Sequence, residues 1–212
     1  MTENIQVFTQ SSIRITSGAG IIYADPFQLR GSFGDAACIL ITHDHYDHFS
    51  EEDILKAACS ETILVVPKKM EKQVKGLSGK VAKILAVMPG EQLDIGGVHL
   101  EAIPAYNILK PFHPKSAGWV GYLLEADGKR IYIAGDTDAT AEAKAVRCDI
   151  ALIPIGGTYT MDAKQAAELI NEMRPETAIP THYGSIVGSP KDGEVFASLV
   201  KAPVKVELKL RF

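Results

Sequence analysis

The spacing of apolar residues divides the start of the chain into short strands. Runs rich in β-branched and aromatic residues cover 5–9, 12–16 and 20–26, and turn residues separate them, which predicts an opening β-meander. The next apolar run, 37–43, is continuous rather than alternating. A strand with both faces covered has this pattern, so we predict a buried central strand that ends at the first histidine.

Helical periodicity follows that strand and returns later in the chain. Residues 50–59 combine Ser50 as an N-cap, acidic residues in the first turn and apolar residues at helical spacing. Residues 160–175 predict a second helix, which begins at Thr160 or Asp162 and ends before Pro175. Three shorter helical stretches are predicted at 67–75, 138–147 and 193–202.

The second half of the chain repeats this style. Hairpin turns are predicted at Gly96-Gly97 and at Asp127-Gly128. Further strands are predicted at 62–67, 81–87, 149–155, 177–184 and 204–210. Two similar halves, each with strands followed by helices, predict two packed sheets with helices outside. No linker or repeat interrupts the sequence, so we expect a single domain over residues 1–212.

Polar residues cluster where apolar strands end, at 43–48, 106–107, 135–137 and 181–183. In layered folds this edge of the sheet is where loops converge. The sequence therefore predicts one site built from loops that are far apart in the chain.

Composition narrows the classes of partner. A hydrophobic content of 46% in 212 residues suits one compact domain, and a net charge of -4 without a dominant basic run argues against a nucleic-acid surface. No signal peptide and no apolar run of about 20 residues is found, which argues against a membrane. Cys38, Cys59 and Cys148 are expected to be reduced thiols. We expect a cytoplasmic protein with a small-molecule substrate; the sequence does not indicate an oligomeric state.

The octapeptide ITHDHYDH, residues 41–48, holds three of the six histidines and two aspartates. Residues two apart on an extended segment can point the same way, so His43 and His45 can face one ion. Asp47 and His48 can face a second ion at the turn into the helix. Imidazole and carboxylate are natural ligands of zinc and neighbouring divalent metals. The alternative, a polar loop at a helix start, explains Ser50 but none of these four residues.

Four motifs resemble the metallo-β-lactamase superfamily. Residues 43–48, HDHYDH, have the HxHxDH form, and GDT (135–137) and THYG (181–184) resemble later motifs in the expected order. YADPF (23–27) resembles the early aspartate at a strand end. The resemblance covers nearly the whole chain and is nearest to the small single-domain Zn-dependent hydrolases, the ascorbate-6-phosphate-lactonase-like branch. It implies an α+β fold, a four-layer αββα sandwich.

The resemblance also implies a ligand set. It places Asp136 between two ions and makes Asp25 a partner of a ligand histidine, which would fix the tautomer of that ring. Without the family, Asp136 could be a turn residue, His182 a core histidine and Asp25 a turn cap. By matching position, the first site takes His43 and His45, and the second takes Asp47, His48 and His182.

The pattern departs from the family at the third histidine of the first site. Tyr106 and Asn107 stand where the family places it, and the next histidine is His113. We favour His113 as the ligand, because an amide oxygen is a poorer zinc ligand than imidazole; Asn107 is the alternative. This departure leaves occupancy of the first site open. His99 lies within a predicted strand and is expected to be structural.

The predicted chemistry is hydrolysis by a metal-bound, bridging hydroxide, since a divalent ion lowers the pKa of bound water. Asp47 or Asp136 would orient the hydroxide, and Tyr159, with Tyr106 and Tyr183 as alternatives, would donate to the developing oxyanion. One or two divalent ions are expected, zinc first, with manganese, nickel and iron as alternatives. No GxSxG motif is present, which argues against a covalent nucleophile.

The sequence says less about the substrate class than about the fold or the metal ligands. Lys110 and Lys115 flank His113 and favour a small anionic ester, lactone or phosphoester, although solvated loop lysines would look the same. Di-iron members of the superfamily carry Glu at the position of His45, so the histidine argues against redox chemistry. A non-catalytic metal-binding or regulatory module on the same fold is the alternative function.

Overall fold

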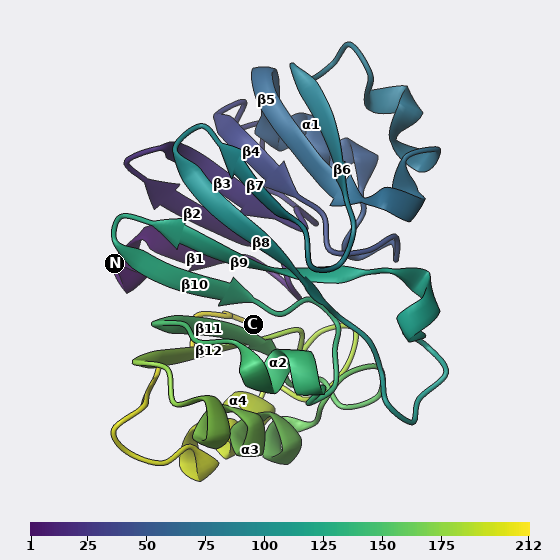
Figure 1. Cartoon of the computed structure of the whole chain (residues 1–212). Helices are drawn as coiled ribbons and strands as arrows, with labels where there is room; N and C mark the ends of the chain where they lie inside the picture. The colour runs from purple at the N-terminus through teal and green to yellow at the C-terminus, as the bar shows by residue number, and fades with distance from the viewer.

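The computed structural model describes residues 1–212 as two β-sheets packed face to face (Figure 1). The first sheet has the order β1-β2-β3-β4-β5-β6, antiparallel from β1 to β3 and parallel from β3 to β6. Its strands are β1 (Ile5–Val7), β2 (Ile13–Ser17), β3 (Gly20–Ala24), β4 (Ala36–Leu40), β5 (Ala58–Pro67) and β6 (Lys83–Val87).

The second sheet repeats this plan in the order β13-β12-β11-β10-β9-β8-β7. It is antiparallel from β7 to β10 and parallel from β10 to β13. Its strands are β7 (Gln92–Ile95), β8 (Val98–Pro104), β9 (Val120–Ala126), β10 (Lys129–Ile133), β11 (Ile150–Pro154), β12 (Thr177–Thr181) and β13 (Lys205–Val206).

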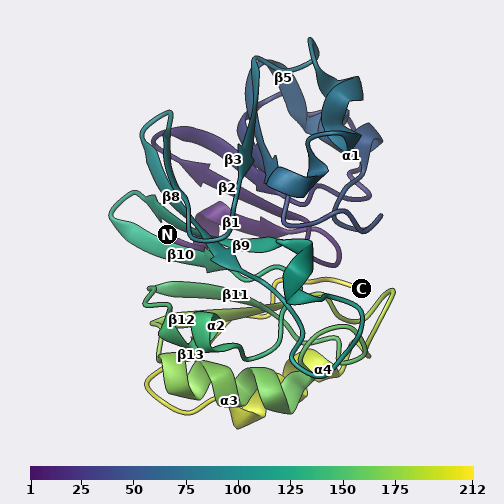
Figure 2. The same cartoon turned by 45° about the vertical axis from the view of Figure 1, so that its right-hand side comes forward.

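Helices cover the outer face of each sheet, which gives four layers (Figures 1 and 2). The first sheet carries α1 (Glu51–Ala57) and the 3-10 helices η2 (Lys68–Met70) and η3 (Gln73–Leu77). The second sheet carries α2 (Ala141–Ala145), α3 (Ala163–Met173) and α4 (Asp192–Leu199). Two more 3-10 helices are η1 (Thr2–Asn4) and η4 (Lys115–Ala117). The predicted α+β αββα sandwich is confirmed.

Strand β4 shows why the layers form. Its side chains alternate, so Cys38 and Leu40 face the large apolar core between the sheets. Ile39 and Ile41 face the smaller core under α1. A strand buried on both sides needs the continuous apolar run seen in the sequence. The strand therefore delivers the residues that follow it, 43–48, to a fixed edge of the sandwich.

The N-caps predicted for two helices are confirmed. Ser50 accepts a hydrogen bond from the Asp53 amide at the start of α1. Asp162 and Gln165 form a reciprocal capping box at the start of α3, which selects Asp162 over Thr160 as the N-cap.

Two predicted elements were wrong in kind or length. The stretch 67–75 forms two 3-10 helices instead of one helix, because the connection between β5 and β6 has to bury Met70, Val74 and Leu77 against the sheet in a short length. The last strand, predicted at 204–210, pairs only at Lys205–Val206. None of the helices has the length and apolar character needed to cross a bilayer.

Candidate metal centre

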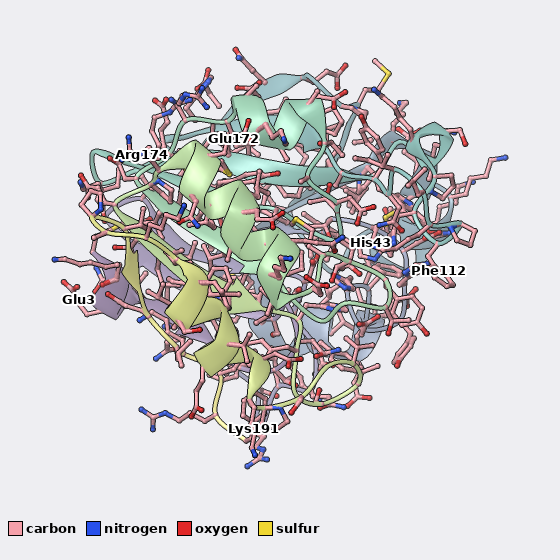
Figure 3. All side chains as sticks on the ribbon, turned by 90° about the horizontal axis from the view of Figure 1, so that it is seen from below. Glu3, His43, Phe112, Glu172, Arg174 and Lys191 are labelled. Atoms are coloured by element: carbon pink, nitrogen blue, oxygen red, sulfur yellow. The ribbon has the colours of Figure 1, made fainter.

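All seven predicted metal ligands lie together at one edge of the sandwich, where β4, β10 and β12 end. Six of them form two groups of three, in each of which the ligand nitrogen and oxygen atoms lie within 4.8 Å of one another, and a third such group, His43, His48 and Asp136, joins these two. We name them the first group and the second group. The first group is His43, His45 and His113; the second is Asp47, His48 and His182. Figure 3 shows His43 on the side of the molecule where Phe112 projects.

Asp136 connects the two groups. Its Oδ2 lies 3.4 Å from Nε2 of His113 and 4.0 Å from Nε2 of His43. The same oxygen lies 3.4 Å from Nε2 of His182, and Oδ1 lies 3.4 Å from Nε2 of His48. One carboxylate thus faces four imidazoles from both groups, the position that a bridging ligand requires.

Asp25 fixes the ring orientation of two histidines from beneath. Its Oδ2 lies 2.7 Å from Nδ1 of His48 and 2.6 Å from the Thr42 hydroxyl, which donates to it. Because that hydroxyl proton is used, Thr42 Oγ1 accepts from Nδ1 of His43 at 2.9 Å. Both rings then carry a proton on Nδ1, and Nε2 of each ring faces the cluster. The geometry of Asp25 is therefore that of a partner to ligand histidines.

His113 is oriented in the same way by a neutral amide. Asn107 Nδ2 donates to the Tyr159 carbonyl at 2.9 Å, so Oδ1 is the atom that faces His113. Nδ1 of His113 donates to this oxygen at 3.1 Å, which leaves its Nε2 lone pair toward Asp136. Of the two alternatives for the first group, His113 turns a ring nitrogen to the cluster and Asn107 turns its oxygen to His113.

The electrostatics of the cluster follow from burial and the charges of its members. Burial, reinforced by the neighbouring rings, holds the pKa of His43 well below its usual value, so this imidazole is neutral. Burial would lower the pKa of His48 as well, but Asp136, Asp25 and Asp47 together raise it to about 9. Burial would raise the pKa of Asp136, but His182 and His48 hold it well below its usual range.

Several buried atoms of the cluster lack a hydrogen-bond partner. They include Nε2 of His48, Nε2 of His113 and Oδ1 of Asp136. Leaving such atoms unpaired in the interior is costly, whereas a divalent cation accepts lone pairs from nitrogen and carboxylate oxygen alike. The donor set therefore fits divalent metal ions.

The backbone at two candidate residues is held in an uncommon conformation. Asp25 has φ 44° and His182 has φ 56°, the left-handed region that non-glycine residues rarely adopt. The amide of His182 donates to the Gln10 carbonyl at 2.9 Å. Across from it, a Cβ on Gly156 would lie 2.3 Å from the His182 carbonyl oxygen, so only glycine fits there. These contacts fix where the His182 ring lies.

Sequence reasoning missed several supporting residues. Trp119, the only tryptophan, lies with its ring centroid 5.1, 5.0 and 5.3 Å from those of His43, His45 and His113. It forms a wall beside the first group. Its place directly before a strand gave no signal of this, and the same holds for Thr42, Gln10 and Gly156.

A pocket of about 370 Å³ opens over the cluster. Of the three candidate tyrosines, only Tyr159 lines it. The hydroxyl of Tyr106 instead donates to Glu142 at 2.8 Å, and Tyr183 is buried with its ring against Phe212. The pocket lining is His45, Tyr46, Asp47, Phe112, Asp136, Tyr159, His182 and Ile186.

The two loop lysines point elsewhere. Lys110 Nζ lies 2.5 Å from Asp138 Oδ1 and donates to the Thr160 carbonyl at 2.7 Å. Lys115 Nζ lies 2.7 Å from Glu142 Oε1. Neither lysine lines the pocket, because carboxylates on neighbouring segments engage them, so the structure gives no support to their binding an anionic substrate. His99 pairs with Asp94 at 2.8 Å and lies outside the cluster.

Comparison with known proteins agrees with this site. A family model described as a beta-lactamase superfamily domain matches residues 4–182. The chain therefore belongs to the metallo-β-lactamase superfamily, as the motifs indicated.

Its relatives include proteins named UPF0173 metal-dependent hydrolase. The one from Nitratidesulfovibrio vulgaris is 32% identical over 190 residues, which cover 82% of this chain and 77% of that protein. The one from Thermococcus onnurineus is 30% identical over 196 residues, 86% of each chain. The crystal structure of a candidate metal-dependent hydrolase from Parabacteroides distasonis matches with a TM-score of 0.83 and 31% identity, over 98% of this chain and 93% of that one.

Proposed function

We propose that this chain is a metal-dependent hydrolase that cleaves a small ester, lactone or phosphoester at a centre for two divalent ions. The first group would hold one ion and the second group the other, with Asp136 shared between them. One observation carries the proposal: the Asp136 carboxylate lies between 3.4 and 4.0 Å from Nε2 of four histidines that belong to both groups. The hydrolase names of the relatives support the same reaction class.

Zinc is the ion we expect first, because neutral imidazoles and carboxylates are its usual ligands; manganese, nickel and iron share this preference in part. When bound, such ions would lower the pKa of a coordinated water and polarise the scissile carbonyl or phosphoryl oxygen. The products are an acid and an alcohol, so the reaction needs water and no oxidant. His45, in place of an acidic ligand, supports hydrolysis over redox chemistry.

The chain's own side chains would then orient the reactants. Burial would raise the pKa of Asp47, but the hydrogen bond from His182 and the nearby His48 lower it, so Asp47 is an ionised carboxylate that can accept a hydrogen bond from water and orient it. Asp136 has the same acceptor character at the centre of the cluster. Tyr159 lines the pocket and would donate its hydroxyl proton to the oxygen on which charge develops.

Some parts of the proposal rest on the sequence alone. The lactone option follows the resemblance to the ascorbate-6-phosphate-lactonase-like branch. A cytoplasmic location, and the exclusion of nucleic acid and membrane as partners, follow from charge and hydropathy. Lys110 and Lys115 form ion pairs with Asp138 and Glu142, so neither supports an anionic substrate.

The test is turnover measured together with metal content. Purified protein should contain one or two divalent ions per chain and should hydrolyse at least one ester, lactone or phosphodiester from a broad panel. Asp136→Ala should abolish turnover while circular dichroism shows a retained fold. Full metal loading without turnover on any substrate would favour the non-catalytic metal-binding or regulatory module.

A further inference from the structure

Four large apolar side chains surround the mouth of the metal pocket. They come from four different loops and are exposed to solvent, Tyr46 by 65%, Phe112 by 41%, Tyr159 by 36% and Ile186 by 40%. We call this set the apolar rim. Exposed apolar groups that gather at one place, rather than singly, mark a binding surface.

Ring contacts hold the rim in place. The Phe112 and Tyr159 rings lie edge to face with centroids 4.7 Å apart, although they come from different loops. On the other side, Tyr46 packs edge to face on Phe27 at 6.0 Å. The Asn107 amide, which orients His113, also bonds to the backbone of Tyr159, so the rim and the cluster share one support.

The pocket offers no cationic side chain beside the rim. None of its eight lining residues is Lys or Arg, and its polar groups are the hydroxyls of Tyr46 and Tyr159 and four of the candidate metal ligands: His45, Asp47, Asp136 and His182. A substrate can therefore place one polar, reacting group on the floor. A second, anionic group would find no cationic partner at the rim and would lose part of its hydration against aromatic and aliphatic carbon.

We infer that the substrate is a carboxylic ester or lactone whose other portion is uncharged and apolar, an aromatic ring or a short alkyl chain seated on the apolar rim. This inference rests on the proposed hydrolase function and names its substrate class. A pocket of about 370 Å³ is in the range of small-ligand sites, so the apolar portion is short.

The experiment uses carboxylates, the product class of ester cleavage, as probes. Acetate, butanoate and hexanoate are titrated by calorimetry into protein whose metal content has been measured. Each added methylene should lower Kd by about threefold to fourfold, the factor expected for its transfer out of water. Hexanedioate, which equals hexanoate in length but carries a second charge, should bind at least about tenfold more weakly than hexanoate.

Matched variants assign the effect to the rim. The double variant Phe112→Ala, Ile186→Ala should flatten the dependence on chain length and leave acetate binding and metal content unchanged. Leu109→Ala, which removes a side chain that is 94% exposed outside the pocket, should leave the dependence as in the wild type.

Three results would overturn the inference: a flat dependence in the wild type, tighter binding of hexanedioate than of hexanoate, or no binding of any carboxylate at full metal loading. A change in the solution mass of the double variant, with an unchanged chain-length dependence, would also overturn it and assign the rim to contacts between proteins. The proposed function fails separately, if chain-length dependence is present and no ester or lactone is turned over.

Discussion

The two groups of candidate ligands have similar chemistry and different supports. The second group sits on the turn after β4 and at the end of β12, and Asp25, a fully buried carboxylate, holds His48 from below. The first group takes His113 from the long loop between β8 and β9, where a neutral amide holds the ring. Strand ends thus fix one site, whereas the other depends on how a loop is tied down.

This difference predicts unequal sensitivity to substitution. A buried carboxylate bonded to a ring nitrogen is a charge-assisted contact, and such contacts are about twice as strong as neutral ones. The loop is tied by separate, weaker contacts: Asn107 to Tyr159, and Lys110 to Asp138 and Thr160. Substitutions that affect the second group should therefore cause a large loss of metal affinity at that group. Substitutions of the separate loop contacts should each cause a smaller loss of metal affinity at the first group.

Removal of a ligand gives the largest effect and tests whether the sites are separate. His182→Ala and His113→Ala should each lower the affinity for one of the two ions only. The loss of affinity should exceed the tenfold to hundredfold cost of losing an outer hydrogen bond. Trp119 packs against the rings of the first group, so quenching of its fluorescence by Co²⁺ should be strongest for an ion at that site. Quenching should be weakened more in His113→Ala than in His182→Ala at the same Co²⁺ concentration.

The opposite pattern of quenching would overturn the assignment of the two groups. Equal loss of both ions in both variants, measured by elemental analysis, would mean a single centre with shared ligands. Leu109→Ala serves as the control for general damage to the loop, since its side chain touches no part of the cluster.

Asp25→Asn should produce the next largest effect. Nδ1 of His48 donates to Asp25 and the Thr42 hydroxyl also donates to it, so an amide at this position turns an acceptor into a donor on at least one side. We expect affinity at the second group to fall by about tenfold to a hundredfold, with a smaller loss at the first group through Thr42 and His43. Competition with a chelator, followed by elemental analysis, measures both.

The control is Asp35→Asn. That carboxylate is 30% exposed and bonds Arg14 and Tyr23 away from the cluster, so metal affinity should stay as in the wild type. If Asp25→Asn also left it unchanged, the support proposed for the second group would be wrong.

The sequence constrains the position of the second group more closely than that of the first, for a physical reason. Asp47 and His48 stand in one short motif, and Asp136 and His182 follow apolar strands, so strand geometry alone brings them to one edge. Loop conformation depends on long-range contacts, which no local pattern contains. The position of Asn107 in the sequence made it a candidate ligand, but the sequence did not predict its hydrogen bond to the Tyr159 backbone.

The dependence on long-range contacts also explains the other differences between the predicted and the observed structure. Helix caps at Ser50 and Asp162 involve neighbours in sequence and were predictable, as were the turns after each strand. The 3-10 geometry at 68–77 and the short β13 depend on what the other layer leaves to be covered. The wall made by Trp119 and the apolar rim join residues that are far apart in the chain.

Asn107→Ala should lower metal affinity at the first group by about tenfold and leave metal affinity at the second group unchanged, because only the orientation of the His113 ring is lost. Trp119 quenching by Co²⁺ gives the affinity. Asn107→Asp keeps an oxygen acceptor for Nδ1 of His113 and loses the donor to Tyr159, so it should retain more affinity than Asn107→Ala. If Asn107→Ala lost all binding at the first group and Asn107→Asp bound the ion more tightly than the wild type, Asn107 itself would be the ligand, because a carboxylate is a better ligand than an amide.

The smallest effect on metal affinity is expected for the Lys110 ion pair, the second contact that holds the loop in place. Its partner Asp138 is 13% exposed and also accepts from the Ile108 amide, so the pair fixes the backbone three to five residues before His113. Partly exposed ion pairs contribute little, about 1 kcal/mol or less, so Lys110→Met should weaken the first group by about twofold to fivefold. Lys115→Met is the matched control, because its ion pair with Glu142 is more exposed and lies after His113. An effect of Lys115→Met as large as that of Lys110→Met would mean that loop charge, rather than the position of the tie, sets the affinity of the first group.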